Sequence, residues 1–130
     1  MRYRRRMDLE NAMQFVREHR NGVLTTIRRD GRPQLSNVLY SVTETGVVRI
    51  SITADRAKAK NLKRDARAAL YVGRDDFWAY VVIDGIAELS PVAQSPGDDT
   101  VDQLVEMYRL GSGEHPDWDQ FRTAMVNDQR

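Results

Sequence analysis

The chain has 130 residues and a mass of 15.0 kDa, enough for one compact domain but too few for two. Its 20 basic and 19 acidic residues give a net charge of +1, so no overall charge drives binding to nucleic acid or membranes. It contains no cysteine and two histidines, which excludes disulfides, cysteine nucleophiles and thiolate or histidine-rich metal sites. No membrane-length apolar run or signal peptide is visible, so we expect a cytoplasmic protein.

The start of the sequence predicts a basic arm followed by a helix. Arg2, Arg4, Arg5 and Arg6 lie in the segment 1–7, which we expect to be flexible, as chain termini often are. Apolar residues at helical spacing follow Asp8, which is a suitable N-cap. Gly22 is placed where a glycine would end that helix.

The next part predicts an antiparallel sheet interrupted by one short helix. Asp30–Gly31 is a strong hairpin signal, Asp55 is the expected N-cap of the short helix, and Asp84–Gly85 is expected to form a bulge or a bend within a strand. Apolar and β-branched alternation predicts the strands, and an alanine- and lysine-rich stretch predicts the helix. The predicted strands cover 23–27, 34–42, 47–53, 68–72 and 78–89, and the helix covers 54–65.

The end of the sequence predicts two more helices, over 98–110 and 118–126, after a stretch rich in proline and glycine. Strands that follow one another without alternating helices do not fit a parallel α/β fold. We therefore expect a mainly β (α+β) domain over 1–130, a small barrel or curled antiparallel sheet with peripheral helices.

One segment carries a charge pattern that breaks a local rule. Ser51 and Thr53 are expected on one face at the end of a strand, and Arg56, Lys58 and Lys60 enter the following helix. Cations at a helix N-terminus oppose the helix dipole, and a bound anion would compensate. The pattern fits either a phosphate site or an ordinary solvated helix with surface lysines.

Three stretches together resemble the pyridoxamine-phosphate-oxidase-like split β-barrel superfamily, and within it the flavin/deazaflavin oxidoreductases that use coenzyme F420. They are Val23-Leu24-Thr25-Thr26-Ile27 through Ser36, the segment Arg56-Ala57-Lys58 with Asn61-Leu62, and 81–88 followed by 113–118. Each stretch is a weak signal alone, but together they cover nearly the whole chain in the family's order.

The resemblance implies an FMN-binding split barrel that forms a homodimer with a cofactor groove at each end of the interface. The cofactor phosphate would lie against one group of residues and the ring along the second strand. The implied cofactor-binding residues are Ser51, Thr53, Arg56, Ala57, Lys58 and Asn61 for the phosphate and Ser36, Asn37 and Val38 for the ring. The basic arm would reach the carboxylate-bearing tail of F420.

The sequence departs from the family pattern at three places. Asn37 stands where members often have proline, so main-chain contacts to the ring are expected there. Ile52 separates Ser51 from Thr53, whereas members commonly have threonine directly after the serine. Members usually continue into a final barrel strand, and this chain stops at Arg130 without one, so we expect either a truncated sequence or a barrel edge that is closed in another way.

The function implied by the resemblance is F420-dependent oxidoreduction, with hydride transfer from reduced F420 to an electron-poor small molecule such as an enone or a quinone. An FMN-dependent oxidase or reductase on the same fold, and a non-catalytic flavin or F420 carrier, are the alternatives. We expect a small-molecule substrate, and neither nucleic acid nor a membrane as partner. No residue is identified as a general acid, base or nucleophile, because the cofactor carries the chemistry in such enzymes.

Single aromatic and histidine residues leave two interpretations open. His19 fits the end of the first helix, and His115 fits a loop-fixing role or a substrate contact. Trp78 and Tyr80 fit core or dimer packing, or the lining of a substrate pocket. Tyr40 fits a buried position in the sheet or a proton donor near the ring.

Overall fold

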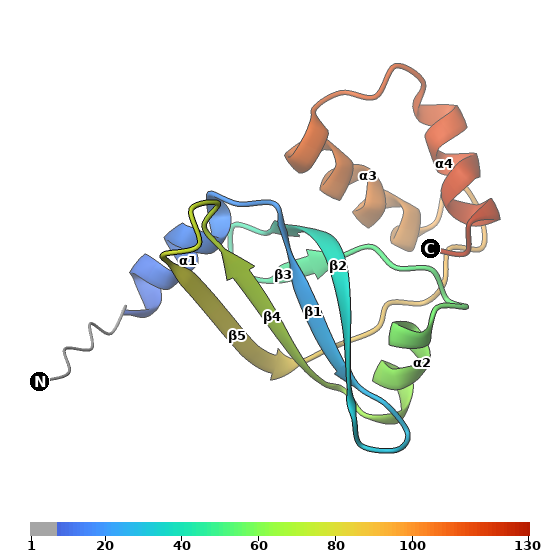
Figure 1. The fold of residues 1–130 in the computed structure, drawn as a ribbon. Coiled ribbons are helices and arrows are strands. Elements are labelled where there is room, and N and C mark those ends of the chain that lie inside the picture. The colour runs from blue at the N-terminus through green and yellow to red at the C-terminus, as the bar shows by residue number, and fades with distance from the viewer. Residues whose placement is uncertain (1–7) are drawn as a thin grey trace, which may run out of the picture.

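A computed structural model describes residues 8–130, so the predicted basic arm over 1–7 lies outside the described residues. Helices and strands follow one another in the order that Figure 1 shows. The elements are α1 (Leu9–Arg17), β1 (Asn21–Ile27), β2 (Pro33–Val42), β3 (Val48–Ile50), α2 (Ala57–Arg64), β4 (Arg67–Gly73), β5 (Tyr80–Ile86), α3 (Asp99–Ser112) and α4 (Trp118–Asn127).

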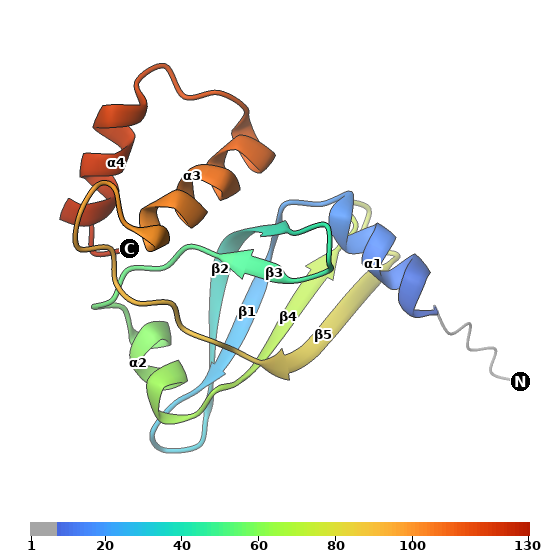
Figure 2. The same cartoon turned by 180° about the vertical axis from the view of Figure 1, so that it is seen from behind.

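The strands form one antiparallel sheet in the order β3-β2-β1-β4-β5. The sheet curls into a half-barrel, with α1 near one end and α2 near the other (Figures 1 and 2). β3 and β5 are its two edges. The expected curled sheet with peripheral helices is confirmed.

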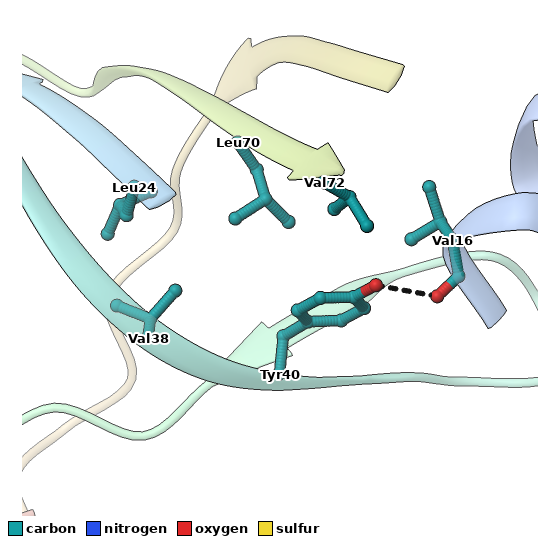
Figure 3. Packing of buried hydrophobic residues seen from close by; sticks show 6 residues of the cluster. All are labelled: Val16, Leu24, Val38, Tyr40, Leu70 and Val72. Carbon is teal, nitrogen blue, oxygen red and sulfur yellow. Dashed lines mark hydrogen bonds between the residues drawn. The ribbon is translucent and has the colours of Figure 1, made fainter. Parts of the chain in front are cut away.

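The concave face of the sheet holds the main core, because alternate residues of each strand point to it. The hydroxyl of Tyr40 donates a hydrogen bond of 2.7 Å to the carbonyl of Val16, which links β2 to α1 (Figure 3). Burial raises the pKa of Tyr40 to about 12, so the hydroxyl stays a donor. The buried cluster consists of Val16, Leu24, Val38, Tyr40, Leu70 and Val72.

A second core lies between α3 and α4, around Val101, Leu104 and Phe121. His115 packs edge-on against Tyr108 with ring centroids 5.1 Å apart, and its Nδ1 accepts a 2.9 Å hydrogen bond from a main-chain N–H two residues on. This histidine therefore holds the loop between the two helices. An ion pair of 3.1 Å between Arg49 and Glu106 ties α3 to β3.

The side chain of Asn61 fixes α2 to the first hairpin of the sheet. This residue is 6% exposed, and its amide nitrogen donates to Thr26 Oγ1 at 3.1 Å and to Gln34 Oε1 at 3.0 Å. Arg64 donates to Asn61 Oδ1 at 2.9 Å and to the carbonyl of Ile27 at 3.0 Å. Both polar ends of the buried amide are therefore satisfied, and α2 is joined to both β1 and β2.

The prediction that Gly22 ends the first helix is wrong. α1 begins after Asp8 as predicted, but it ends at Arg17, and Gly22 lies inside β1 opposite Val38. A Cβ atom at Gly22 would lie 2.5 Å from the main-chain oxygen of Tyr71 on β4. The glycine is required by the close approach of a neighbouring strand, which the local sequence does not reveal.

Three further boundaries differ from the sequence prediction. The N-cap of α2 is Arg56 and not Asp55. The strand predicted over 47–53 is β3 and ends at Ile50, so Ser51 and Thr53 follow the strand and do not share a strand face. The strand predicted over 78–89 is the shorter β5, and it has no bulge, because Asp84 and Gly85 pair in unbroken register with β4.

The Tyr40–Val16 hydrogen bond predicts the effect of Tyr40→Phe. The carbonyl of Val16 keeps its 3.3 Å hydrogen bond from the N–H of His19 but loses the shorter one, which we expect to lower the free energy of unfolding by about 0.5–1.5 kcal/mol. Tyr80→Phe is the matched control, since Tyr80 is 62% exposed. Urea denaturation at pH 7 measures both variants, and equal stabilities would contradict the assigned bond.

The raised pKa of Tyr40 also predicts a pH dependence. Between about pH 10 and pH 12 the unfolded chain releases the tyrosine proton first, so the folded state loses stability as the pH rises. Tyr40→Phe cannot ionise, so its stability deficit should shrink over this range. Urea midpoints of wild type and variant across that range test this; a constant deficit would contradict it.

The Asn61 contacts predict that Asn61→Ala destabilises the fold. The variant leaves polar groups of Thr26, Gln34 and Arg64 without their partner, at a cost of about 1–3 kcal/mol in the free energy of unfolding. Lys60→Ala, an exposed neighbour on the same helix, is the control. Thermal and urea unfolding measure the difference, and a stability like that of the control would show that the amide is dispensable.

Candidate functional site

The N-terminus of α2 differs from the starts of the other helices. Asp8, Asp98 and Asp117 each cap their helix with a carboxylate that accepts a main-chain N–H hydrogen bond. α2 begins at Arg56, whose side chain makes no cap hydrogen bond, and its first turn contains no acidic residue. The first N–H groups of α2 are therefore open to an external acceptor such as a phosphate oxygen.

The hydroxyl of Thr53 lies in the segment that leads into this helix. Its Oγ1 is buried and has no hydrogen-bond partner among residues 8–130, which is rare for a buried polar atom. The carbonyl of Thr53 accepts a hydrogen bond of 3.2 Å from the N–H of Arg56, so the residue is held close to the start of the helix. An unused hydroxyl beside open N–H groups fits an oxyanion ligand.

The positive side chains at this helix start have no ion-pair partner in the part of the chain that the structure describes. Arg56 is exposed and Lys58 is half-buried, and neither makes an ion pair within residues 8–130. Ala57 is the first residue of α2 and offers its main-chain N–H. Thr53, Arg56, Ala57 and Lys58 thus lie at or just before the start of one helix, and their contact with a cofactor stays a prediction.

The three residues predicted along the ring do not present their side chains to one face. Val38 is buried in the core and Ser36 shares its side of the sheet, whereas Asn37 points to the exposed convex side. Tyr40, considered as a proton donor, is buried and uses its hydroxyl on Val16. Strand alternation therefore turns the side chain of Asn37 away from those of Ser36 and Val38.

The main chain of β2, rather than its side chains, offers hydrogen-bonding groups to a ligand. β3 pairs only with residues 40–42 of β2, so the preceding part of β2 pairs with β1 alone. The N–H of Tyr40 points toward β1, because it donates to the carbonyl of Arg20 at 2.8 Å. Along an antiparallel strand, the N–H and C=O groups of successive residues point alternately to one side and the other. The main-chain groups of Asn37 therefore point away from β1, to the open edge.

The segment between β3 and α2 runs beyond that open edge. β3 ends at Ile50, opposite Tyr40, and the chain continues through Ser51 and Thr53 to α2. Figure 1 shows this segment leaving β3, bowing away from β2 and returning to α2 near the far end of the sheet. The phosphate-binding candidates and the open edge of β2 thus belong to one side of the half-barrel.

Asn61 has a structural role that the sequence prediction did not include. Its amide donors are used by Thr26 and Gln34, and its oxygen accepts from Arg64, so no donor is left for a ligand. The residue acts on the candidate site by holding α2 in place. A direct contact between Asn61 and a cofactor stays a prediction.

A cavity of about 730 Å³ adjoins this region between the concave side of the sheet and α3. Of the predicted site residues, only Ser51 lines it. Gln103, Met107 and the segment 86–92 also line it, and sequence analysis assigned none of them to a site. These residues lie far apart along the chain, so no local sequence pattern connects them. The sequence signalled only the segment 86–92, through the proline-containing break after β5.

The described residues contain neither a membrane-spanning helix nor a candidate metal centre. No helix within 8–130 is both long and apolar enough to cross a bilayer. The same residues hold no group of three or more histidine or carboxylate side chains that could bind a metal ion. The groups that the candidate site offers to a ligand are a hydroxyl, main-chain N–H groups and cationic side chains.

Solved structures resemble this fold over two thirds of the chain or more. The conserved hypothetical protein Rv2991 from Mycobacterium tuberculosis matches with a TM-score of 0.72 and 26% identity, over 95% of this chain and 76% of that one. An F420 reductase matches with a TM-score of 0.54 and 26% identity, over 67% and 68% of the two chains. The heme storage protein HutZ from Vibrio cholerae matches with a TM-score of 0.62 and 17% identity, over 92% and 82%, which shows the fold alone.

A family model agrees with these structures. The model described as pyridoxamine 5'-phosphate oxidase matches residues 9–125, from the start of α1 into α4. The match therefore includes all five strands and the candidate site at α2, and the split-barrel fold predicted from the sequence is confirmed. The chain belongs to the pyridoxamine 5'-phosphate oxidase family.

Proposed function

We propose that this chain binds F420 and is an oxidoreductase that transfers a hydride from reduced F420 to an electron-poor small molecule such as an enone or a quinone. The observation that carries the proposal is the uncapped start of α2 beside the unpartnered hydroxyl of Thr53. The likeness to an F420 reductase at 26% identity supports the choice of cofactor.

The residues at the start of α2 fit a phosphate group. The Thr53 hydroxyl and the main-chain N–H groups of Ala57 and Lys58 would donate hydrogen bonds to its oxygens, and Arg56 and Lys58 would balance its charge. The main-chain groups of Asn37 on the open edge of β2 would hold the ring. When bound, the deazaflavin supplies the hydride, and the protein supplies position and excludes water.

FMN is the second candidate cofactor, because the chain's family is that of pyridoxamine 5'-phosphate oxidase. FMN also carries a phosphate, so the groups at the start of α2 suit either molecule. A non-catalytic carrier of F420 or FMN would use the same contacts. A side-by-side fluorescence titration of dialysed protein with F420 and FMN separates the cofactors, and turnover of enones or quinones separates enzyme from carrier.

The phosphate site predicts a loss of affinity in Lys58→Ala. Removing a charge-assisted contact worth about 1.5–3 kcal/mol should raise the dissociation constant for the bound cofactor about tenfold or more. The free energy of unfolding should stay unchanged, because Lys58 makes no ion pair within residues 8–130. The cofactor titration and urea denaturation measure these two quantities.

Lys63→Ala is the matched control, since Lys63 lies on the same helix but in its last turn. We expect its cofactor affinity to equal that of wild type. Equal affinities for wild type, Lys58→Ala and Lys63→Ala would refute the phosphate site. Failure of wild type to bind either F420 or FMN would refute the proposed function itself.

A further inference from the structure

The cavity of about 730 Å³ lies apart from the groups assigned to the cofactor phosphate. Ser51 and Ala54 line it, whereas Thr53, Arg56 and Lys58 do not. Figure 2 shows the segment that follows β5 crossing the open side of the half-barrel on its way to α3. The cavity that this segment helps to enclose is therefore a second candidate ligand site.

Apolar side chains from three strands and α2 form much of the cavity wall. They include Leu24 of β1, Ile50 of β3, Ala68 of β4 and Leu62 of α2. Val47 and Leu89 also line the cavity, and they remain 55% and 40% exposed. Apolar walls that stay in contact with water favour a ligand with an apolar body, because binding removes both surfaces from water.

The cavity wall offers no ring on which a planar ligand could stack. Among residues 8–130, those that line the cavity include no phenylalanine, tyrosine, tryptophan or histidine. Aromatic rings gain additional stability by packing against other rings, and the aliphatic side chains of this wall do not provide that contact. Met107, which also lines the cavity, has a flexible side chain that adapts to irregular apolar shapes. The lining therefore suits an aliphatic chain better than a planar ring.

Arg130 brings a positive charge to this apolar wall. Its main-chain N–H donates to the carbonyl of Met125 at 3.1 Å, and its carbonyl accepts from the N–H of Ala93 at 2.8 Å, so the residue is held at the cavity. Its Nε is buried and has no hydrogen-bond partner among residues 8–130, and its guanidinium makes no ion pair with them. A carboxylate would supply the missing acceptor, because its two oxygens match the donors of a guanidinium.

The other charged side chains of the lining leave the cavity positive. Arg49 is already paired with Glu106 on α3 at 3.1 Å. Lys63 is exposed and makes no ion pair within residues 8–130. Glu88 is the one acidic residue that the described chain contributes to the lining, and it is exposed. This balance favours an anion over a neutral or cationic ligand.

We propose that this cavity binds an aliphatic monocarboxylate, with its chain along the apolar wall and its carboxylate on the guanidinium of Arg130. Small-molecule sites usually measure roughly 300–1,000 Å³ and combine an apolar lining with a few polar groups that fix the ligand's orientation. The cavity has both properties. This site goes beyond the proposed function, because its charge and its apolar wall come from residues other than those assigned to F420 or FMN.

Calorimetric titration of the cofactor-free protein with decanoate at pH 7 tests the proposal. The probe is ionised at this pH, because carboxylic acids lose their proton near about pH 4. We expect one decanoate to bind per chain. Decan-1-ol has the same chain length but no charge, so it should bind at least about tenfold more weakly, which is the loss of one charge-assisted hydrogen bond.

Arg130→Gln tests the contact with the carboxylate. The variant should raise the dissociation constant for decanoate about tenfold or more and leave that for decan-1-ol unchanged. Its free energy of unfolding should not fall, because the guanidinium makes no ion pair within residues 8–130; urea denaturation measures this. Arg32→Gln is the matched control, since Arg32 is an exposed arginine between β1 and β2 that does not line the cavity.

A second variant locates the bound chain independently of charge. Gln103 is an exposed residue of α3 that lines the cavity, so Gln103→Trp should narrow the cavity without disturbing a core. We expect it to weaken the binding of both decanoate and decan-1-ol. Gln120→Trp, at an exposed position of α4 outside the lining, should bind both probes as wild type does.

Any one of four results would overturn the proposal. They are a wild type that does not bind decanoate, equal affinities for decanoate and decan-1-ol, a decanoate affinity that Arg130→Gln and Arg32→Gln change equally, and equal binding by Gln103→Trp and Gln120→Trp. All of these titrations use protein without cofactor. Their failure would leave the proposed function intact, since that function is tested by the titrations with F420 and FMN.

Discussion

The side-chain amide of Asn61 joins α2 to β1 and β2, and the candidate site depends on this joint. Its three polar contacts lie within 3.1 Å in a buried position, so α2 cannot shift without leaving polar groups unpaired. Because these contacts fix the middle of α2, its first turn can remain uncapped and surrounded by cations. The buried amide thus holds the electrostatically unfavourable helix start that an anion would stabilise.

The curl of the sheet gives its two faces different roles. On the concave face, Val16 of α1 packs into the core, and Tyr40 fixes α1 there through its hydrogen bond. The convex face has the same alternation but nothing over it within residues 8–130. The cofactor proposal concerns the open edge of β2 and the start of α2.

The fold and part of the site could be predicted because their signals are local. The Asp30–Gly31 hairpin is confirmed, with Gly31 at a φ of +87°, since a tight turn is specified by its own residues. The cationic start of α2 could be found because Arg56 and Lys58 are close in sequence. The partners of Asn61 could not be predicted, because Thr26 and Gln34 are 35 and 27 residues away along the chain. Nothing in a sequence indicates which of its polar residues form hydrogen bonds with each other.

The sequence by itself determined the alternation of the strands, the order of the elements and the membership of the chain in its family. Only the tertiary structure decided why Gly22 is a glycine, which hydroxyl is left without a partner, and which sheet face stays uncovered. The physical reason is that periodicity and turn chemistry act over a few residues. Close approach, burial and hydrogen-bond pairing instead depend on segments that meet only when the sheet curls.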